Sequence, residues 1–117
     1  MDEQGNLRSP CNLYMNGAEI FTFTLAEVPA CVETLLQRSG RKVEHIDLFV
    51  FHQANQYMLE HLRKKMKLPK EKFCITLRHL GNTVPSTIPI ALWHAAQERR
   101  LRSGQIVMLV GFGVGYS

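Results

Sequence analysis

The sequence lacks the features that would place it in a membrane or in a secretory pathway. It has no apolar run of about 18 residues or more, so no transmembrane helix is expected. The first residues, Met1-Asp2-Glu3-Gln4-Gly5, are acidic and polar, and they do not follow the basic-then-apolar layout of a signal peptide. We therefore expect a cytoplasmic protein with no membrane partner.

The sequence also lacks the cysteine, histidine and glycine motifs that form disulfide frameworks, metal sites or dinucleotide sites. The three cysteines, Cys11, Cys31 and Cys74, are widely spaced and include no CxxC pair, which argues against a disulfide framework or a cysteine-based zinc site. The five histidines contain no HExxH motif, so no metal site is expected. Residues 111–115 read GxGxG rather than GxGxxG and no helix follows them, so no dinucleotide cofactor is predicted.

The charge that is present is basic and unevenly distributed. The net charge is +4. Two groups of basic residues account for much of it: Arg63, Lys64, Lys65, Lys67, Lys70 and Lys72, and then Arg99, Arg100 and Arg102. This favours an acidic partner only weakly, and a solvated helix face is the simpler interpretation. No aromatic residues are interleaved with the first group, so a nucleic-acid partner is not expected.

Apolar periodicity predicts an α/β fold. Helical spacing covers residues 18–38, 55–68 and 86–101, and short apolar runs at 46–51 and 106–110 are typical of buried strands. A weaker alternation at 73–77 favours a further short strand. This order requires at least one parallel crossover. Pro29 should kink or divide the first helix near Leu25, and Gly40 should end it. The inward-facing residues are expected to be Met58, Leu59, Leu62 and Met66 in the second helix, and Ile90, Leu92, Trp93 and Ala96 in the third.

Two polar residues next to apolar segments form the candidate site. His52 follows a predicted strand, and open α/β sheets place ligand sites at the carboxyl ends of their strands. Asn82 lies in a loop before the third helix. A histidine and an asparagine at one site can both donate hydrogen bonds to a developing oxyanion. Each also has a structural interpretation, His52 as a hydrogen-bonding residue of the core and Asn82 as a helix cap.

Three ordered motifs resemble one enzyme family. His52-Gln53-Ala54-Asn55, Gly81-Asn82-Thr83 and the glycines at 111–115 look like the C-terminal half of β-ketoacyl-acyl-carrier-protein synthase III. The likeness runs from about Tyr14 to Ser117. It implies the C-terminal half of a thiolase-like α/β fold, a mixed sheet with flanking helices whose final strand is missing. Residues 1–13 would form an N-terminal loop or linker and 14–117 the domain, without the N-terminal half that carries the catalytic cysteine.

The resemblance also implies a function and a set of roles. The family condenses an acyl group from acyl-CoA with malonyl-acyl carrier protein in fatty-acid synthesis, using Cys, His and Asn and no cofactor. By motif match, His52 and Asn82 would be the catalytic oxyanion donors, and an isolated chain without the cysteine would be inactive. A homodimer is implied too. The remaining assignments are Phe112, Gln53 and Asn55 for lining the active site, and Lys64 and Lys65 for docking the carrier protein.

The chain departs from the family pattern at several positions. Tyr57 and Thr22 stand where many members carry basic residues, and Val84-Pro85 replaces small residues, so carrier recognition and the acyl donor can differ. Two alternatives stay open. One is a related acyltransferase that does not condense; the other is a non-catalytic module that binds an acidic carrier protein through Lys64, Lys65 and Lys67.

Overall fold

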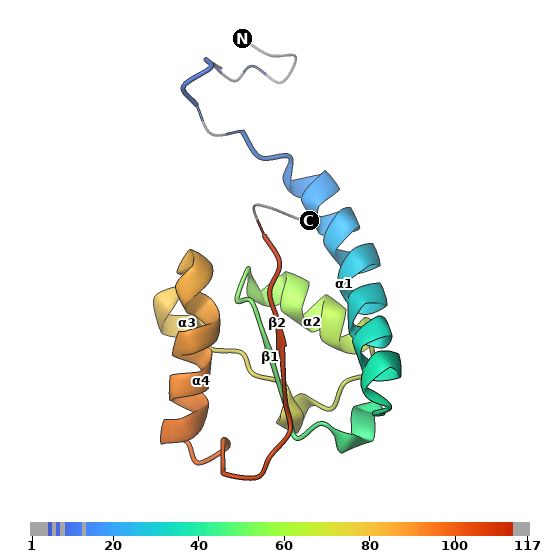
Figure 1. Cartoon of the computed structure of the whole chain (residues 1–117). Helices are drawn as coiled ribbons and strands as arrows, with labels where there is room; N and C mark the ends of the chain where they lie inside the picture. The colour runs from blue at the N-terminus through green and yellow to red at the C-terminus, as the bar shows by residue number, and fades with distance from the viewer. Residues whose placement is uncertain (1–4, 6, 8, 13, 114–117) are drawn as a thin grey trace.

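The computed structural model describes residues 5, 7, 9–12 and 14–113 of the 117-residue chain. A two-stranded sheet lies between helices on its two sides (Figure 1). Helices α1 (Gly17–Ser39) and α2 (Gln56–Lys65) cover one face, and α4 (Thr87–Gln97) packs on the other. A short helix, α3 (Leu77–Leu80), precedes α4 along the chain. None of the described helices is long and apolar enough to cross a membrane.

The sheet consists of two parallel strands, as the order of elements predicted. β1 (Leu48–Phe51) pairs with β2 (Val107–Val110), with Leu48 opposite Val107 and Phe51 opposite Val110. The strand predicted at 73–77 is reduced to one bridge, between Phe49 and Phe73, because the chain turns into α3 at Leu77. The predicted loop at residues 1–13 lies partly outside the described residues, as do the last positions of the glycine motif at 111–115.

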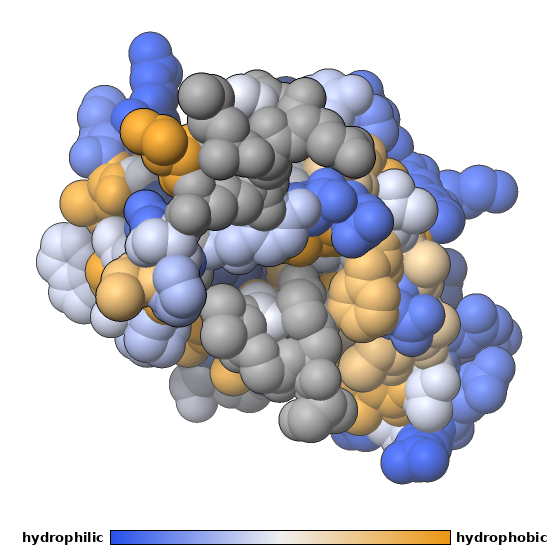
Figure 2. All heavy atoms as spheres, turned by 90° about the horizontal axis from the view of Figure 1, so that it is seen from above, coloured by the Kyte–Doolittle hydropathy of each residue, from blue (hydrophilic) through white to orange (hydrophobic). Residues whose placement is uncertain are grey.

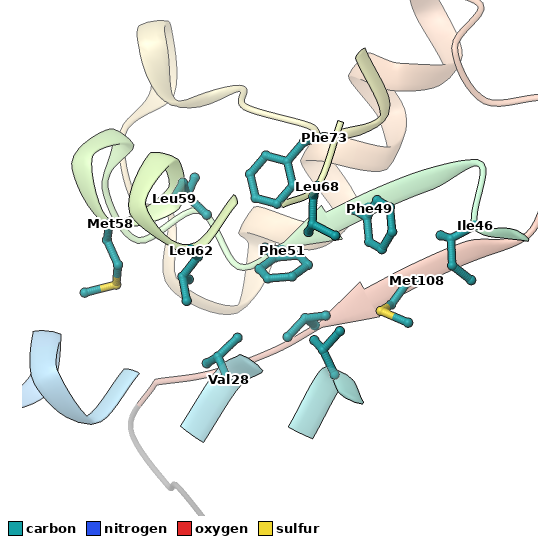
Figure 3. Packing of buried hydrophobic residues seen from close by; sticks show 12 residues of the cluster. Val28, Ile46, Phe49, Phe51, Met58, Leu59, Leu62, Leu68, Phe73 and Met108 are labelled. Carbon is teal, nitrogen blue, oxygen red and sulfur yellow. The ribbon is translucent and has the colours of Figure 1, made fainter. Parts of the chain in front are cut away.

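Side chains of β1 alternate between two separate cores. Phe49 and Phe51 join α1 and α2 in the larger cluster, where the rings of Phe51 and Phe73 lie 5.0 Å apart (Figure 3). Leu48 and Val50 point the other way, toward α4. All four strand residues are buried, as expected of a parallel strand that is covered on both faces.

Helix α1 is continuous through Pro29, so of the predicted kink or division the division is wrong. Proline has no N–H, and the carbonyl of Leu25 therefore loses its usual donor four residues ahead. The Nζ of Lys65 donates to this oxygen instead, at 2.6 Å. The helix ends at Gly40 as predicted, in the left-handed conformation (φ 64°).

Helix α4 buries a face that only partly matches the predicted one. Its buried residues are Thr87, Ala91 and Ala95, whereas Trp93 is 60% exposed and Ala96 is exposed. Of the large apolar residues that were predicted, Leu92 is partly buried and packs against the cluster on this side of β1. The helix also ends earlier than predicted, at Gln97. Arg99 adopts a left-handed φ of 57°, and the N–H groups of residues 99 and 100 bond back to the carbonyls of Ala96 and Ala95.

Candidate functional site at the carboxyl ends of the strands

The candidate site lies where both strands end and α4 begins. These three ends are at the same side of the molecule (Figure 1). His52 directly follows β1, and its N–H donates to the carbonyl of Val110 at 2.8 Å, which extends the pairing of the strands by one bond. Phe112 follows β2. The view onto this end shows hydrophobic residues exposed among hydrophilic ones (Figure 2).

The imidazole of His52 is held on two sides. Its Nδ1 lies 2.7 Å from the Oγ1 of Thr87, the first residue of α4. The ring of Phe112 meets it edge-on, with centroids 5.2 Å apart and planes at 86°. Burial lowers the pKa of His52, because the charged imidazolium is poorly solvated there. His52 is therefore a neutral group near pH 7, with Nε2 as the ring nitrogen that does not face Thr87.

Asn82 lies on the loop between α3 and α4. Its Oδ1 accepts a hydrogen bond from the N–H of Val84 at 2.8 Å, which closes a tight turn. Helix α4 starts only at Thr87 and has no side-chain cap, so Asn82 is not its cap. The turn engages the amide oxygen and leaves the NH₂ group of this exposed residue as a donor. Within the described part of the chain, the side-chain hydrogen bonds of His52 and Asn82 run to Thr87 and Val84, not to each other.

Gln53 and Asn55, the predicted lining residues, both make structural hydrogen bonds. Gln53 is 1% exposed; its Nε2 donates to the carbonyls of Phe51 and Cys74, and its Oε1 accepts from the N–H of Thr76. Asn55 caps α2, where its Oδ1 accepts from the N–H of Met58 at 2.8 Å. Both residues thus fix the backbone on either side of His52. Phe112 is the predicted lining residue that touches the His52 ring.

The sequence reasoning missed Thr87. The residue reads as one more polar position at the start of a helix, and its partner is 35 residues away in the chain. The sequence does show that Thr87 carries a hydroxyl group a few residues after the Gly-Asn-Thr motif. Its place near the predicted site could have marked it as a candidate partner of His52.

Comparison with known proteins identifies the family. The model of the 3-oxoacyl-[acyl-carrier-protein] synthase III C-terminal domain matches residues 36–117. The chain belongs to this family. The synthase III of Prochlorococcus marinus is 38% identical over 105 residues, which cover 90% of this chain and 31% of that protein. The synthase III of Listeria welshimeri is 39% identical over 110 residues, covering 94% and 35%.

Solved structures agree with this assignment. A crystal structure of 3-oxoacyl-(acyl-carrier-protein) synthase III superimposes with a TM-score of 0.92 at 52% identity, over 98% of this chain and 34% of that one. The synthase III structure from Thermus thermophilus gives 0.84 at 38% identity, over 89% and 32%. The predicted thiolase-like α/β fold is thereby confirmed. The chain spans about a third of the length of these relatives.

The two lysines predicted to dock a carrier protein differ in their surroundings in this synthase III domain. Both belong to the last turn of α2. Both side chains are exposed, but the Nζ of Lys65 donates to the Leu25 carbonyl and so stabilises α1. Lys64 is thus the one whose charge is more available to a partner.

The described residues hold no group of three His, Cys, Asp or Glu side chains arranged to bind a metal ion. The polar groups that meet at the end of β1 are instead the His52 imidazole and the Thr87 hydroxyl, and the Asn82 amide lies on the loop that leads to α4. These are neutral hydrogen-bonding groups, which can stabilise a developing negative charge without themselves changing charge.

Proposed function

We propose that this domain supplies two oxyanion donors to a decarboxylative Claisen condensation in fatty-acid synthesis. The observation that carries the proposal is the half-buried His52, held at the strand ends by Thr87 and Phe112 in surroundings that lower its pKa and so favour the neutral imidazole. Asn82 supplies the second donor through its free amide N–H groups. The acyl donor would be an acyl-CoA, the extender malonyl-acyl carrier protein, and no cofactor is required.

The reaction builds negative charge on one oxygen. A cysteine thiolate attacks the acyl-CoA carbonyl and CoA leaves as its thiolate, giving an acyl-enzyme. Malonyl-acyl carrier protein then loses carbon dioxide, and the electrons of the broken C–C bond form an enolate on its thioester. The enolate carbon attacks the acyl-enzyme carbonyl, and the cysteine thiolate leaves. Neutral donors at the enolate oxygen lower the barrier to decarboxylation.

The nucleophile is expected from outside this domain. Burial raises the pKa of the Cys74 thiol, which disfavours its thiolate, and Cys74 lies on the α4 side of the sheet. Cys11 and Cys31 are exposed, and Cys31 is part of α1. Among the described residues, the side-chain contacts of His52 are with Thr87 and Phe112 and not with a cysteine. We infer that the N-terminal half of a synthase III provides the cysteine, and that this chain is inactive without it.

The test is to join this chain to a matching N-terminal half and to measure carbon dioxide release from malonyl-acyl carrier protein. Removing one oxyanion donor lowers the rate about 10²–10³-fold. We therefore expect His52→Ala and Asn82→Ala each to slow carbon dioxide release by that factor. His45→Ala is the control, because His45 is exposed and lies before β1. If both site variants decarboxylate as fast as the control, the assigned roles are wrong. If Asn82→Ala retains acyl transfer in an enzyme that never condenses, the chain belongs to a non-condensing acyltransferase.

Carrier-protein docking is a separate proposal. Lys64 is exposed at the end of α2, among other basic residues, which suits an acidic partner. In the joined enzyme, Lys64→Glu should raise the KM for malonyl-acyl carrier protein and leave kcat unchanged, with a smaller effect at high salt. An unchanged KM at low salt would exclude Lys64 from the docking surface. Binding of carrier protein without any condensation would instead favour the non-catalytic module.

A further inference from the structure

The contact between Thr87 and His52 is the most specific feature of the site that the family motifs do not explain. Thr87 is 2% exposed, and its Oγ1 lies 2.7 Å from Nδ1 of His52. The contact joins the first residue of α4 to the residue that follows β1, 35 positions apart. A hydrogen bond to one ring nitrogen of a histidine determines what the other nitrogen can do.

We propose that Thr87 is a positioning residue that donates its hydroxyl hydrogen to Nδ1 of His52 and so keeps the ring proton on Nε2. The inference deepens the proposed function, on which it rests, because a neutral histidine can serve as an oxyanion donor through Nε2 only in this tautomer. The opposite arrangement, with the proton on Nδ1, would present a lone pair to the oxyanion.

The surroundings of the hydroxyl indicate the direction of the bond. Threonines within α1 donate to the carbonyl four residues earlier, as Thr22 does to Ala18 at 3.0 Å and Thr34 to Ala30 at 2.9 Å. Thr87 has no helical carbonyl four residues earlier to accept such a bond, because it is the first residue of α4 and Thr83 is not helical. In the described part of the chain, the Thr87 hydroxyl is paired with Nδ1 of His52. A buried hydroxyl needs an acceptor for its hydrogen, and Nδ1 fills that need only when it is unprotonated.

Two further features favour a neutral ring in a fixed orientation. Phe112 packs edge-on against the imidazole, and a flip of the ring would break the bond between Nδ1 and Thr87. The imidazole also faces the N-terminus of α4, an 11-residue helix whose first turn contains no acidic residue. The positive end of the helix dipole disfavours an imidazolium at this position. Protonation of Nδ1 would also break the hydroxyl-to-nitrogen bond.

The tautomer can be read directly by nitrogen NMR on this chain with ¹⁵N-labelled histidine, using His52→Gln to assign the ring signals. At neutral pH we expect His52 to show a protonated Nε2 and an unprotonated Nδ1. Thr87→Ser keeps the hydroxyl and should keep this pattern. Thr87→Val keeps the shape without the hydroxyl and should shift the signals toward a mixture of tautomers. Thr34→Val, which removes a hydroxyl on α1, is the control and should change nothing at His52.

A protonated Nδ1 in the unmodified chain would overturn the proposal, whether or not the valine variant folds. An unchanged pattern in a folded Thr87→Val chain would overturn it as well. In the joined enzyme, Thr87→Val should lower kcat for decarboxylation about 10-fold without raising KM, less than the 10²–10³ expected for loss of a donor. Thr87→Ser should restore most of that rate. If the NMR pattern is as expected but His52→Ala leaves decarboxylation intact, the proposed function fails and the tautomer assignment stands.

Discussion

The bond between Lys65 and the Leu25 carbonyl predicts an energetic coupling between Lys65 and Pro29. Pro29 has no N–H, so the Leu25 oxygen lacks its helical donor, and the Lys65 ammonium takes that place at 2.6 Å. Pro29→Ala would give the oxygen its normal partner from residue 29. Lys65 should therefore matter for stability only while residue 29 is proline.

The size of the coupling follows from the type of bond. A hydrogen bond that involves a charged group contributes about 1.5–3 kcal/mol, but Lys65 is exposed, and water weakens the interaction. We expect Lys65→Met to lower the free energy of unfolding by about 1 kcal/mol when Pro29 is present. In the Pro29→Ala background the same change should cost close to nothing. The coupling energy of the double-mutant cycle should thus be about 1 kcal/mol.

The assay is equilibrium unfolding in urea, followed by circular dichroism, for the four chains of the cycle. Lys64→Met is the matched control, since Lys64 is the exposed neighbour of Lys65 on the same turn of α2. Its free energy of unfolding should stay within about 0.5 kcal/mol of that of the parent chain. Equal costs of Lys65→Met in both backgrounds would refute the reasoning. A Lys65→Met chain as stable as the parent would do so too.

Three further predictions concern the surroundings of His52 and the cysteines. Gln53→Leu removes three hydrogen bonds between the buried Gln53 side chain and the backbone, and it should lower the free energy of unfolding in urea by about 3 kcal/mol. A loss below about 1 kcal/mol would contradict a structural role for Gln53. Iodoacetamide should modify Cys11 and Cys31 in the folded chain and spare Cys74, as read by intact mass, until urea exposes it. Because burial lowers the pKa of His52, the unfolded state takes up its proton first as pH falls. Stability should therefore decline below about pH 6.5, and His52→Gln should flatten that decline in urea titrations between neutral and acidic pH.

The sequence was sufficient for the features that depend on local pattern. The inner face of α2 was predicted correctly at Met58, Leu59 and Leu62, since these large apolar residues recur at helical spacing and all three are buried. At least one parallel crossover was predicted from short apolar runs separated by helices, and β1 and β2 are the strands that form it. Gly40 was recognised as a helix end because only a left-handed residue closes that turn without strain.

The features that were missed depend on partners distant in sequence. The inward face of α4 is set by how closely small residues such as Ala91 and Ala95 allow the helix to approach β1, which hydropathy does not record. The donor that the Leu25 carbonyl finds in place of the missing N–H of Pro29 is an ammonium group 40 positions away. The bond of Thr87 to His52 is equally nonlocal. In each case the sequence contains the side chain but does not show which distant group it contacts.

The two strands differ in how their α4-side faces are covered. Val50 and Leu109 are partners in register, so they point to the same side of the sheet. Val50 is fully buried beneath α4, whereas Leu109 is 50% exposed, because α4 packs over β1 and the apolar face extends beyond it across β2. A parallel strand that is apolar on both faces is normally covered on both. The exposure of Leu109 therefore supports the expectation that further polypeptide packs here, in keeping with relatives about three times as long as this chain.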